Sequence, residues 1–167
     1  IRNLELKNRI YMPAMHMNMA VDFEVTDQLI DFYAERARGG VGIITVGYAT
    51  VDEYSGMTTN IGTHKDEYIP GLKRLADAIK TNGARAAVQI NHAGRYMHSM
   101  FLNGKQPVAP SAVASRMTRE TPRELTVEEI NAAVKAAAEA GLVVMQIITG
   151  QHQAVAIPGI DPAAKEG

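Results

Sequence analysis

The chain has 167 residues, of which 46% are hydrophobic and 21% are charged, and its formal net charge is −1. This length suffices for one domain with a sizeable core, and the balanced charge gives no reason to expect nucleic acid or a membrane surface as a partner. The absence of cysteine excludes disulfides and cysteine-held iron–sulfur clusters within these residues. No apolar run approaches the ~20 residues that span a bilayer, and no signal peptide is evident, so we expect a cytoplasmic protein.

The first expected element is a short strand from about Arg9 to Met12, within the stretch NRIYMPAM. A helix follows, because Thr26 is a suitable N-cap and an apolar face recurs at helical spacing. That face consists of Leu29, Tyr33 and Ala37. Gly39 and Gly40 are expected to end this helix, since glycine accepts the left-handed geometry of a C-cap. The run from Val41 to Val46 then predicts a strand buried on both faces.

The same unit recurs twice. In the second copy Pro70 suits the first helical turn and Asn82-Gly83 the stop, before the apolar run of residues 86–90. Its helical stripe consists of Leu72, Leu75 and Ile79. In the third copy Thr126 and Glu129 form a capping box, Gly141 ends the helix, and Leu142 to Ile148 is the strand.

The expected order is therefore β-α-β-α-β-α-β. Strands this apolar imply a parallel sheet flanked by helices. Right-handed crossovers leave two main architectures, an open doubly wound sheet or a (β/α)₈ barrel. Both place their chemistry at the carboxyl ends of the strands.

The residues at these carboxyl ends are rich in polar and ionisable side chains, whereas the amino ends are chemically plain. The ends are Pro13 to His16, Gly47 to Thr50, Gln89 to Arg95 and Thr149 to His152. Three of the five histidines lie there, so we expect the functional site at this edge.

Individual residues of this edge also have structural interpretations. His92 beside Gly94 could simply cap the strand backbone, and Arg95 could form a structural ion pair rather than contact a ligand. Metal binding by His16, His92 and His98 lacks the tight spacing of known metal motifs, so no metal is expected. The sequence contains no GxGxxG, no Walker sequence and no GxSxG, which counts against an ordinary dinucleotide fold.

Four stretches, in this order and spacing, resemble the old yellow enzyme family. They are LKNRIYMPAM, GGVGIITVG, AVQINHAGR and PVAPSAV. The family consists of FMN-dependent ene-reductases built on a (β/α)₈ TIM barrel, and the branch of 2-enoate and 2,4-dienoyl-CoA reductases looks most similar. The resemblance runs from Ile1 to about Gly141.

The resemblance implies where FMN would lie. By this likeness the flavin is lined by Pro13, Ala14 and Met15, faced by His16, approached at its O4/N5 edge by Gly47 and Tyr48, and hydrogen-bonded at its pyrimidine end by Gln89. A carboxamide suits a ring edge that carries both donors and acceptors. NADH or NADPH would reduce the flavin, which would pass hydride to the C=C bond of an α,β-unsaturated carbonyl or carboxyl compound.

The chain departs from the family after the fourth strand. The family's pair of substrate-holding donors falls on Ile148 and Gln151, and its proton-donating tyrosine falls on Gln153. His152 is displaced by one residue, which turns a strand side chain to the opposite face. The catalytic residues are therefore left unassigned.

The length corresponds to roughly the first four β/α units of a barrel, since a complete one takes ~250 residues. We expect residues 1–167 to be the N-terminal half of an FMN-binding barrel, with residues 142–167 departing from the pattern. Unpaired edge strands then call for the remainder of a longer chain or a homo-oligomer. The alternative is a catalytically silent half-barrel that acts by associating with a partner chain. A barrel aldolase lacks support, because no lysine stands at a strand end.

Overall fold

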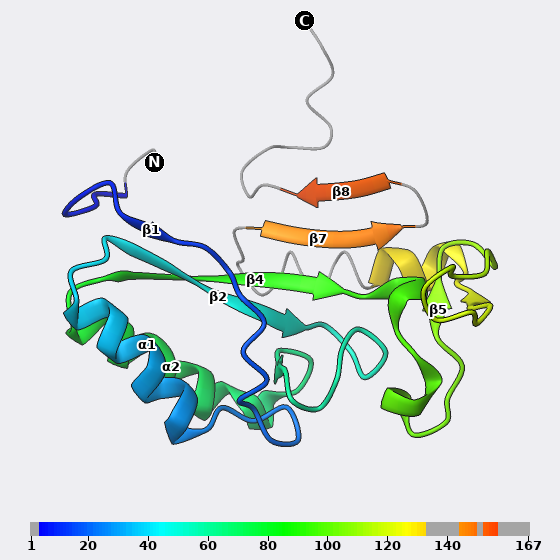
Figure 1. Cartoon of the computed structure of the whole chain (residues 1–167), viewed down its shortest axis with the longest axis horizontal. Coiled ribbons are helices and arrows are strands. Elements are labelled where there is room, and N and C mark those ends of the chain that lie inside the picture. Colours follow the sequence, from blue (N-terminus) through cyan, green and yellow to red (C-terminus); the bar gives the residue numbers. More distant parts are fainter. Residues whose placement is uncertain (1–3, 133–143, 150–151, 157–167) are drawn as a thin grey trace, which may run out of the picture.

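The computed structural model describes residues 4–132, 144–149 and 152–156, and its main sheet has the order β1-β2-β4-β7-β8 with β3 beside β2 (Figure 1). The strands of this sheet are β1 (Tyr11–Met12), β2 (Ile43–Thr50), β3 (Ile61–Gly62), β4 (Arg85–His92), β7 (Val144–Thr149) and β8 (His152–Ala156). Two α-helices, α1 (Asp27–Arg38) and α2 (Ile69–Thr81), accompany this sheet. A small parallel sheet joins β5 (Val108–Ala109) to β6 (Arg123–Glu124).

The sequence signals for the helices are confirmed. The amide of Leu29 donates to Thr26 Oγ1 over 3.3 Å at the start of α1, and Gly40 takes a φ of +100° after its end. Residues 127–132 are helical, and the expected capping box forms in both directions. The Glu129 amide donates to Thr126 Oγ1 over 3.2 Å, and the Thr126 amide donates to Glu129 Oε2 over 2.8 Å.

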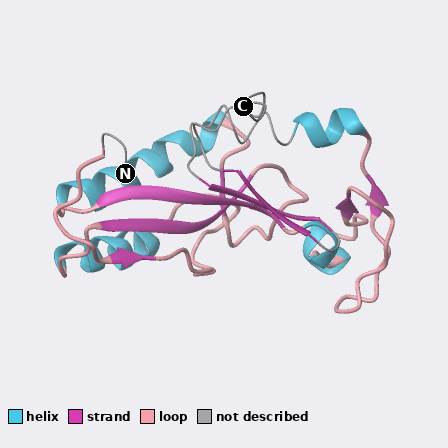
Figure 2. Ribbon diagram, turned by 90° about the horizontal axis from the view of Figure 1, so that it is seen from above, coloured by secondary structure: helices cyan, strands magenta, loops and turns pink. Residues whose placement is uncertain are grey.

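The parallel strands β1, β2, β4 and β7 follow one another in chain order, and α1 and α2 pack together on one face of the sheet (Figures 1 and 2). A doubly wound sheet would reverse its strand order and carry helices on both faces. Sequential order with the helices on one face is the arrangement of a (β/α)₈ barrel, so this chain forms part of such a barrel.

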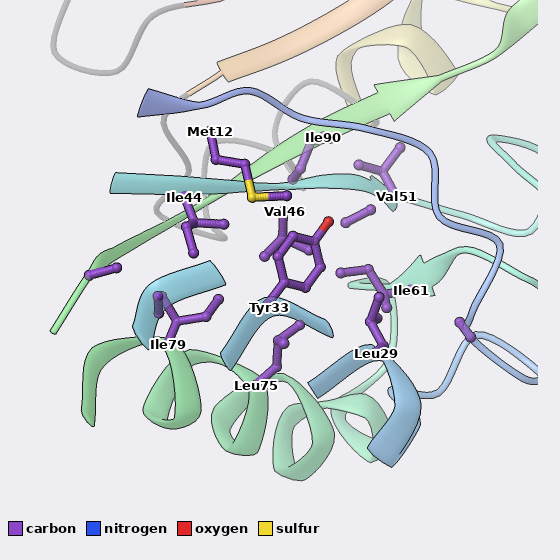
Figure 3. Close-up of a cluster of buried hydrophobic side chains, with 14 residues drawn as sticks. Met12, Leu29, Tyr33, Ile44, Val46, Val51, Ile61, Leu75, Ile79 and Ile90 are labelled. Carbon is purple, nitrogen blue, oxygen red and sulfur yellow. The ribbon is translucent and has the colours of Figure 1, made fainter. Parts of the chain in front are cut away.

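A core of apolar side chains lies between the sheet and the two helices (Figure 3). Tyr33 and Leu29 of α1 and Ile79 of α2 meet Ile44 and Val46 of β2, all with at most 4% of their surface exposed. Burying each large aliphatic side chain contributes about 1.5–3 kcal/mol. This layer fixes the position of the strand ends.

The amino end of the sheet is closed by the segment that precedes β1. Asn8 donates from Nδ2 to the carbonyl of Gly40 over 2.8 Å, and its Oδ1 accepts from the Ile10 amide over 3.0 Å. Gly42 lies so close that a Cβ there would stand 2.5 Å from Asn8 Oδ1 and 2.8 Å from its carbonyl oxygen. Glycine is therefore required at position 42.

Several expected boundaries were wrong. The first strand covers only Tyr11–Met12, and the second runs over Ile43–Thr50 instead of stopping at Val46. The register of β2 against β4 shifts between Val46 and Ala49, so Gly47 and Tyr48 belong to an irregular part of the strand. Before this bulge the core-facing residues are Ile44 and Val46, and after it they are Ala49 and Val51.

Burial of the strands on both faces was also a wrong expectation. Arg85 and Ala86 are exposed at the amino end of β4, and burial is complete only over its last three residues. A further difference is β8, which pairs antiparallel with β7 through Met145↔Ala156 to Thr149↔His152. The predicted stop at Gly141 lies outside the described residues.

A search of the described residues finds no helix with the length and apolar character needed to cross a membrane.

Candidate functional site

The segment after β1 lies directly against the irregular part of β2. Backbone pairing joins His16 to Gly47, and a Cβ on Gly47 would stand 2.6 Å from the Ala14 Cβ and 2.8 Å from the Met15 nitrogen. The Gly47 amide donates to the buried hydroxyl of Tyr33 over 3.4 Å. A glycine at position 47 thus brings the ends of the first two strands into contact, as the sequence analysis expected for a shared site.

The side chains of His16 and Tyr48 meet at this contact. Their ring centroids are 4.8 Å apart and the rings are tilted by 42°. Burial lowers the pKa of His16, while a hydrogen bond to the buried Asn60 acts in the opposite direction. At neutral pH the imidazole is therefore mainly uncharged.

Tyr48 is fixed by two further contacts. Burial raises the pKa of its phenol, while a hydrogen bond with the buried Asn91 side chain acts to lower it. Gly56 packs on the ring, since a Cβ there would stand 3.1 Å from Tyr48 Cε2 and 2.5 Å from Thr50 Cγ2. Asn91 comes from β4, so this cluster joins three strand ends.

Gln89 lies on the same side of β4 as Asn91. The side chains of Val88 and Ile90 pack into the core beneath the sheet. Because successive strand residues point to opposite faces, Gln89 and Asn91 face away from α1 and α2. Gln89 is half-buried there, so its carboxamide stands where a barrel has its interior.

Beside this cluster, His92 supports the strand ends. Its Nδ1 accepts from the Gly94 amide over 3.0 Å, which leaves the proton on Nε2, 3.5 Å from Asp52 Oδ2. Burial raises the pKa of Asp52, but hydrogen bonds from His92, the Tyr54 amide and Ser55 outweigh burial and hold that pKa below its ordinary value. The backbone-capping interpretation of His92 is therefore correct.

Arg95 and His98, the other candidate residues that follow β4, have different contacts. The Nε of Arg95 is buried and without a hydrogen bond, its guanidinium lies 5.5 Å from the Tyr96 ring centroid, and no ion pair involves it within the described residues. His98 instead contacts Glu120 at 3.2 Å and caps the Met100 amide. Within the described part of the chain, no three His, Asp or Glu side chains gather as metal ligands.

The remaining predicted residues have mixed outcomes. Pro13 and Met15 are exposed at the carboxyl edge and Ala14 is half-buried there. Ile148 is the last residue but one of β7, and His152 and Gln153 begin β8, opposite Thr149 and Ile148. Their side chains, and all of Gln151, lie outside the described residues, so their roles stay predictions.

Asp52 and Asn60 are residues around this cluster that sequence reasoning missed, whereas Asn91 lay within the expected edge of Gln89 to Arg95 but received no role there. Asp52 and Asn60 follow β2, in a segment whose composition is typical of a loop. Only Asn91 gave a usable signal, because it lies two residues after Gln89 and must share its face.

A cavity of about 540 Å³ lies at the opposite, amino end of the sheet. Its lining consists of Glu5, Leu6, Lys7, Gly42, Lys80, Gly83, Ala84 and Arg85. These residues hold the N-terminal segment in place, since Arg85 Nε donates to the Glu5 carbonyl over 3.2 Å. In parallel α/β folds the chemistry belongs to the other end, so we assign this cavity no catalytic role.

The described residues fit the ring end of a flavin. Gln89 offers a donor and an acceptor, Tyr48 and His16 offer flat polar rings, and Gly47 keeps the backbone uncrowded. Arg95 supplies a buried nitrogen with an unused proton at the same end of β4. A bound FMN would supply hydride transfer, and these side chains would hold and orient its ring.

Comparison with known proteins agrees with this arrangement. Residues 1–144 match the family described as NADH:flavin oxidoreductase / NADH oxidase. A metal reductase of Desulforamulus reducens is 47% identical over 140 residues, which cover 84% of this chain and 21% of the relative. An NADH:acrylate oxidoreductase of Vibrio harveyi is 43% identical over 76% of this chain and 13% of the relative.

A solved structure of 2-naphthoyl-CoA reductase superposes with a TM-score of 0.72 at 31% identity, over 85% of this chain and 25% of that protein. The chain therefore spans about a quarter or less of each of these three relatives.

Proposed function

Because the chain belongs to the NADH:flavin oxidoreductase / NADH oxidase family, whose members are FMN-binding enzymes, we propose that it forms part of an enzyme that reduces alkenes. The substrate class is an α,β-unsaturated carbonyl or carboxyl compound, and NADH or NADPH is the reductant. The observation that carries this proposal is the meeting of His16, Tyr48 and Asn91 at the carboxyl edge of the barrel strands.

The chemistry of these groups suits such a substrate. Alkene reduction needs polar groups that bind the carbonyl oxygen of the substrate or give a proton to one of its carbons. These groups must stand beside the flavin ring and leave that ring accessible. The amides, imidazole and phenol of this edge provide polar groups without a fixed positive charge. Names of relatives support the substrate class, since they include an acrylate reductase and a fumarate reductase.

Anaerobic reaction of the full chain with FMN, NADH and acrylate tests the proposal. We expect NADH to bleach the flavin and acrylate to restore its colour with formation of propionate, identified by mass spectrometry. Ferric citrate serves as a second acceptor, because a metal reductase is 47% identical. Reoxidation by ferric ion together with no reaction with acrylate, crotonate or 2-cyclohexenone would show the proposal to be wrong.

A second candidate function, a half-barrel that acts through association, is favoured by the outer edge of β1. Ile10 and Tyr11 there expose 57% and 55% of their surface, which is unusual for apolar strand residues beside a core. We expect further barrel strands, from the same chain or from a second copy, to cover this edge. Light scattering of the full chain gives its oligomeric state, and the visible absorption spectrum gives its flavin content. A flavin-free dimer favours association as the function, and a flavin-loaded protein favours catalysis.

A further inference from the structure

Reduction of a C=C bond adds a hydride to one carbon and a proton to the other. By the family resemblance, the position of a proton-donating tyrosine falls on Gln153. A carboxamide does not release a proton at neutral pH. If the proposed function holds, the proton comes from another group, and the described residues contain a candidate.

Tyr48 has the position for this task. Its phenol hydrogen-bonds with Asn91, which faces away from α1 and α2, so the ring lies on that side of the sheet. His16 contacts the ring, Gly56 packs on it, and the side chain remains only half-buried. The ring is thus held in place while it stays accessible from the barrel interior.

Asn91 holds the phenol in place through a neutral contact. The side chains of Tyr48 and the buried Asn91 share a hydrogen bond. A carboxamide can donate to a phenolic oxygen, and in that arrangement the O–H of Tyr48 is left to point elsewhere. Because burial raises the pKa of Tyr48, the phenol is protonated at neutral pH.

His16 completes the arrangement. Burial lowers the pKa of its imidazole, while a hydrogen bond with the buried Asn60 acts to raise it. His16 thus presents an uncharged ring to Tyr48 and does not draw the phenolic proton into an ion pair.

We propose that Tyr48 is the proton donor of alkene reduction and that Asn91 is its positioning residue; this rests on the proposed function. As hydride reaches the β-carbon, the π electrons of the C=C bond form a new C–H bond at the α-carbon with the Tyr48 proton. The O–H electron pair stays on the phenolic oxygen, where the Asn91 amide stabilises it. Water then returns a proton to the tyrosinate.

The test uses the FMN-loaded full chain and Tyr48→Phe, with two acceptors. Ferricyanide takes electrons only, whereas acrylate also needs a proton at carbon. We expect reoxidation by acrylate to fall roughly 10²-fold or more relative to reoxidation by ferricyanide. Loss of the flavin contact lowers both rates alike, so the ratio of the two rates reports the missing proton. Tyr11→Phe, on the exposed edge of β1, is the matched control and should change neither rate.

A second measurement checks the hydrogen-bond polarity without catalysis. Ultraviolet titration of wild type minus Tyr48→Phe isolates the ionisation of Tyr48. Asn91→Ala should raise the pKa of Tyr48, because a donor to the phenolate is lost. A lowered pKa would show that Tyr48 donates to Asn91 and would overturn the assignment.

The outcomes separate the two proposals. A wild-type protein that reduces no alkene contradicts the proposed function, and this assignment with it. A wild-type protein that reduces acrylate, with Tyr48→Phe equally fast, overturns only the role of Tyr48. Equal slowing of acrylate and ferricyanide also overturns that role, because it indicates altered flavin binding rather than a missing proton.

Discussion

The two ends of the main sheet are built on the same strands but contain different chemistry. At the amino end, the side chain of Asn8 bonds to the backbone of Gly40 and Ile10, and Gly42 packs against Asn8. At the carboxyl end, Gly47 packs equally closely on the segment after β1, but the side chains of His16, Tyr48 and Asn91 meet beside it.

The difference indicates that the amino end of the sheet serves mainly stability and the carboxyl end mainly ligand binding. The oxygens of Asn8 leave no room for an added atom at Gly42, so the amino end is sensitive to steric change. Side chains that meet through single hydrogen bonds can be replaced with smaller cost to folding, so changes at the carboxyl end should mainly affect ligand binding. The following predictions test this division, from the largest expected effect to the smallest.

Gly42→Val should give the largest loss of stability. The added carbons would collide with Asn8, whose oxygens stand 2.5 and 2.8 Å from the ideal Cβ position, and overpacking of this kind costs about 3 kcal/mol. Urea unfolding followed by circular dichroism measures the loss. Gly39→Ala, at an ordinary helical φ of −66°, is the control, and an equal loss in both variants would contradict the account.

His92→Ala should cost about 2 kcal/mol, because the buried Gly94 amide loses its acceptor and Asp52 loses its partner. His98→Ala is a matched control, since His98 also accepts from an amide two residues on and also contacts a carboxylate, but in a more exposed place. Urea unfolding of both variants makes the comparison. A larger loss for His98→Ala would show that His92 does not support the strand ends.

Gln89→Leu should weaken FMN binding about tenfold, because one or two hydrogen bonds to the flavin are lost. We expect the free energy of unfolding of the flavin-free protein to change little, in contrast to Gly42→Val. Quenching of FMN fluorescence on titration with the full chain gives the dissociation constant. Undiminished affinity in this variant would remove Gln89 from the flavin site.

The smallest effect concerns pH. The pKa of Asp52 lies below its ordinary value of 3.8 in the folded chain, so its ionised form stabilises the fold above that pH. This stabilisation is lost as the pH falls through the lowered folded-state pKa. Wild type should therefore exceed Asp52→Asn in thermal stability at pH 6, and the difference should shrink below pH 3.8. A difference that grows on acidification would contradict the hydrogen bond between His92 and Asp52.

Local signals in the sequence predicted most of the fold. Thr26 and the Gly39-Gly40 pair located α1 because capping and glycine geometry depend on neighbouring residues only. The full length of β2 was missed because Gly47 resembles a strand end, whereas pairing with β4 on one side and β3 on the other carries the strand to Thr50. The antiparallel strand β8 has no sequence period that distinguishes it from a loop.

The candidate site was predictable in its location but only partly in its members. Parallel topology placed it at the carboxyl ends, and the family resemblance, confirmed by the match over residues 1–144, supplied Gly47, Tyr48 and Gln89. Asn60 could not be found, because its contact with His16 spans more than forty residues and depends on how the chain after β2 folds back.

One measurement tests the central claim most directly, namely that the carboxyl edge of this sheet holds a flavin ring. The visible absorption spectrum of FMN is recorded with the full chain and with its Gln89→Leu and Tyr48→Phe variants. The account predicts a shifted, structured flavin band with wild type, which both substitutions perturb. A spectrum identical to that of free FMN at saturating protein would contradict it.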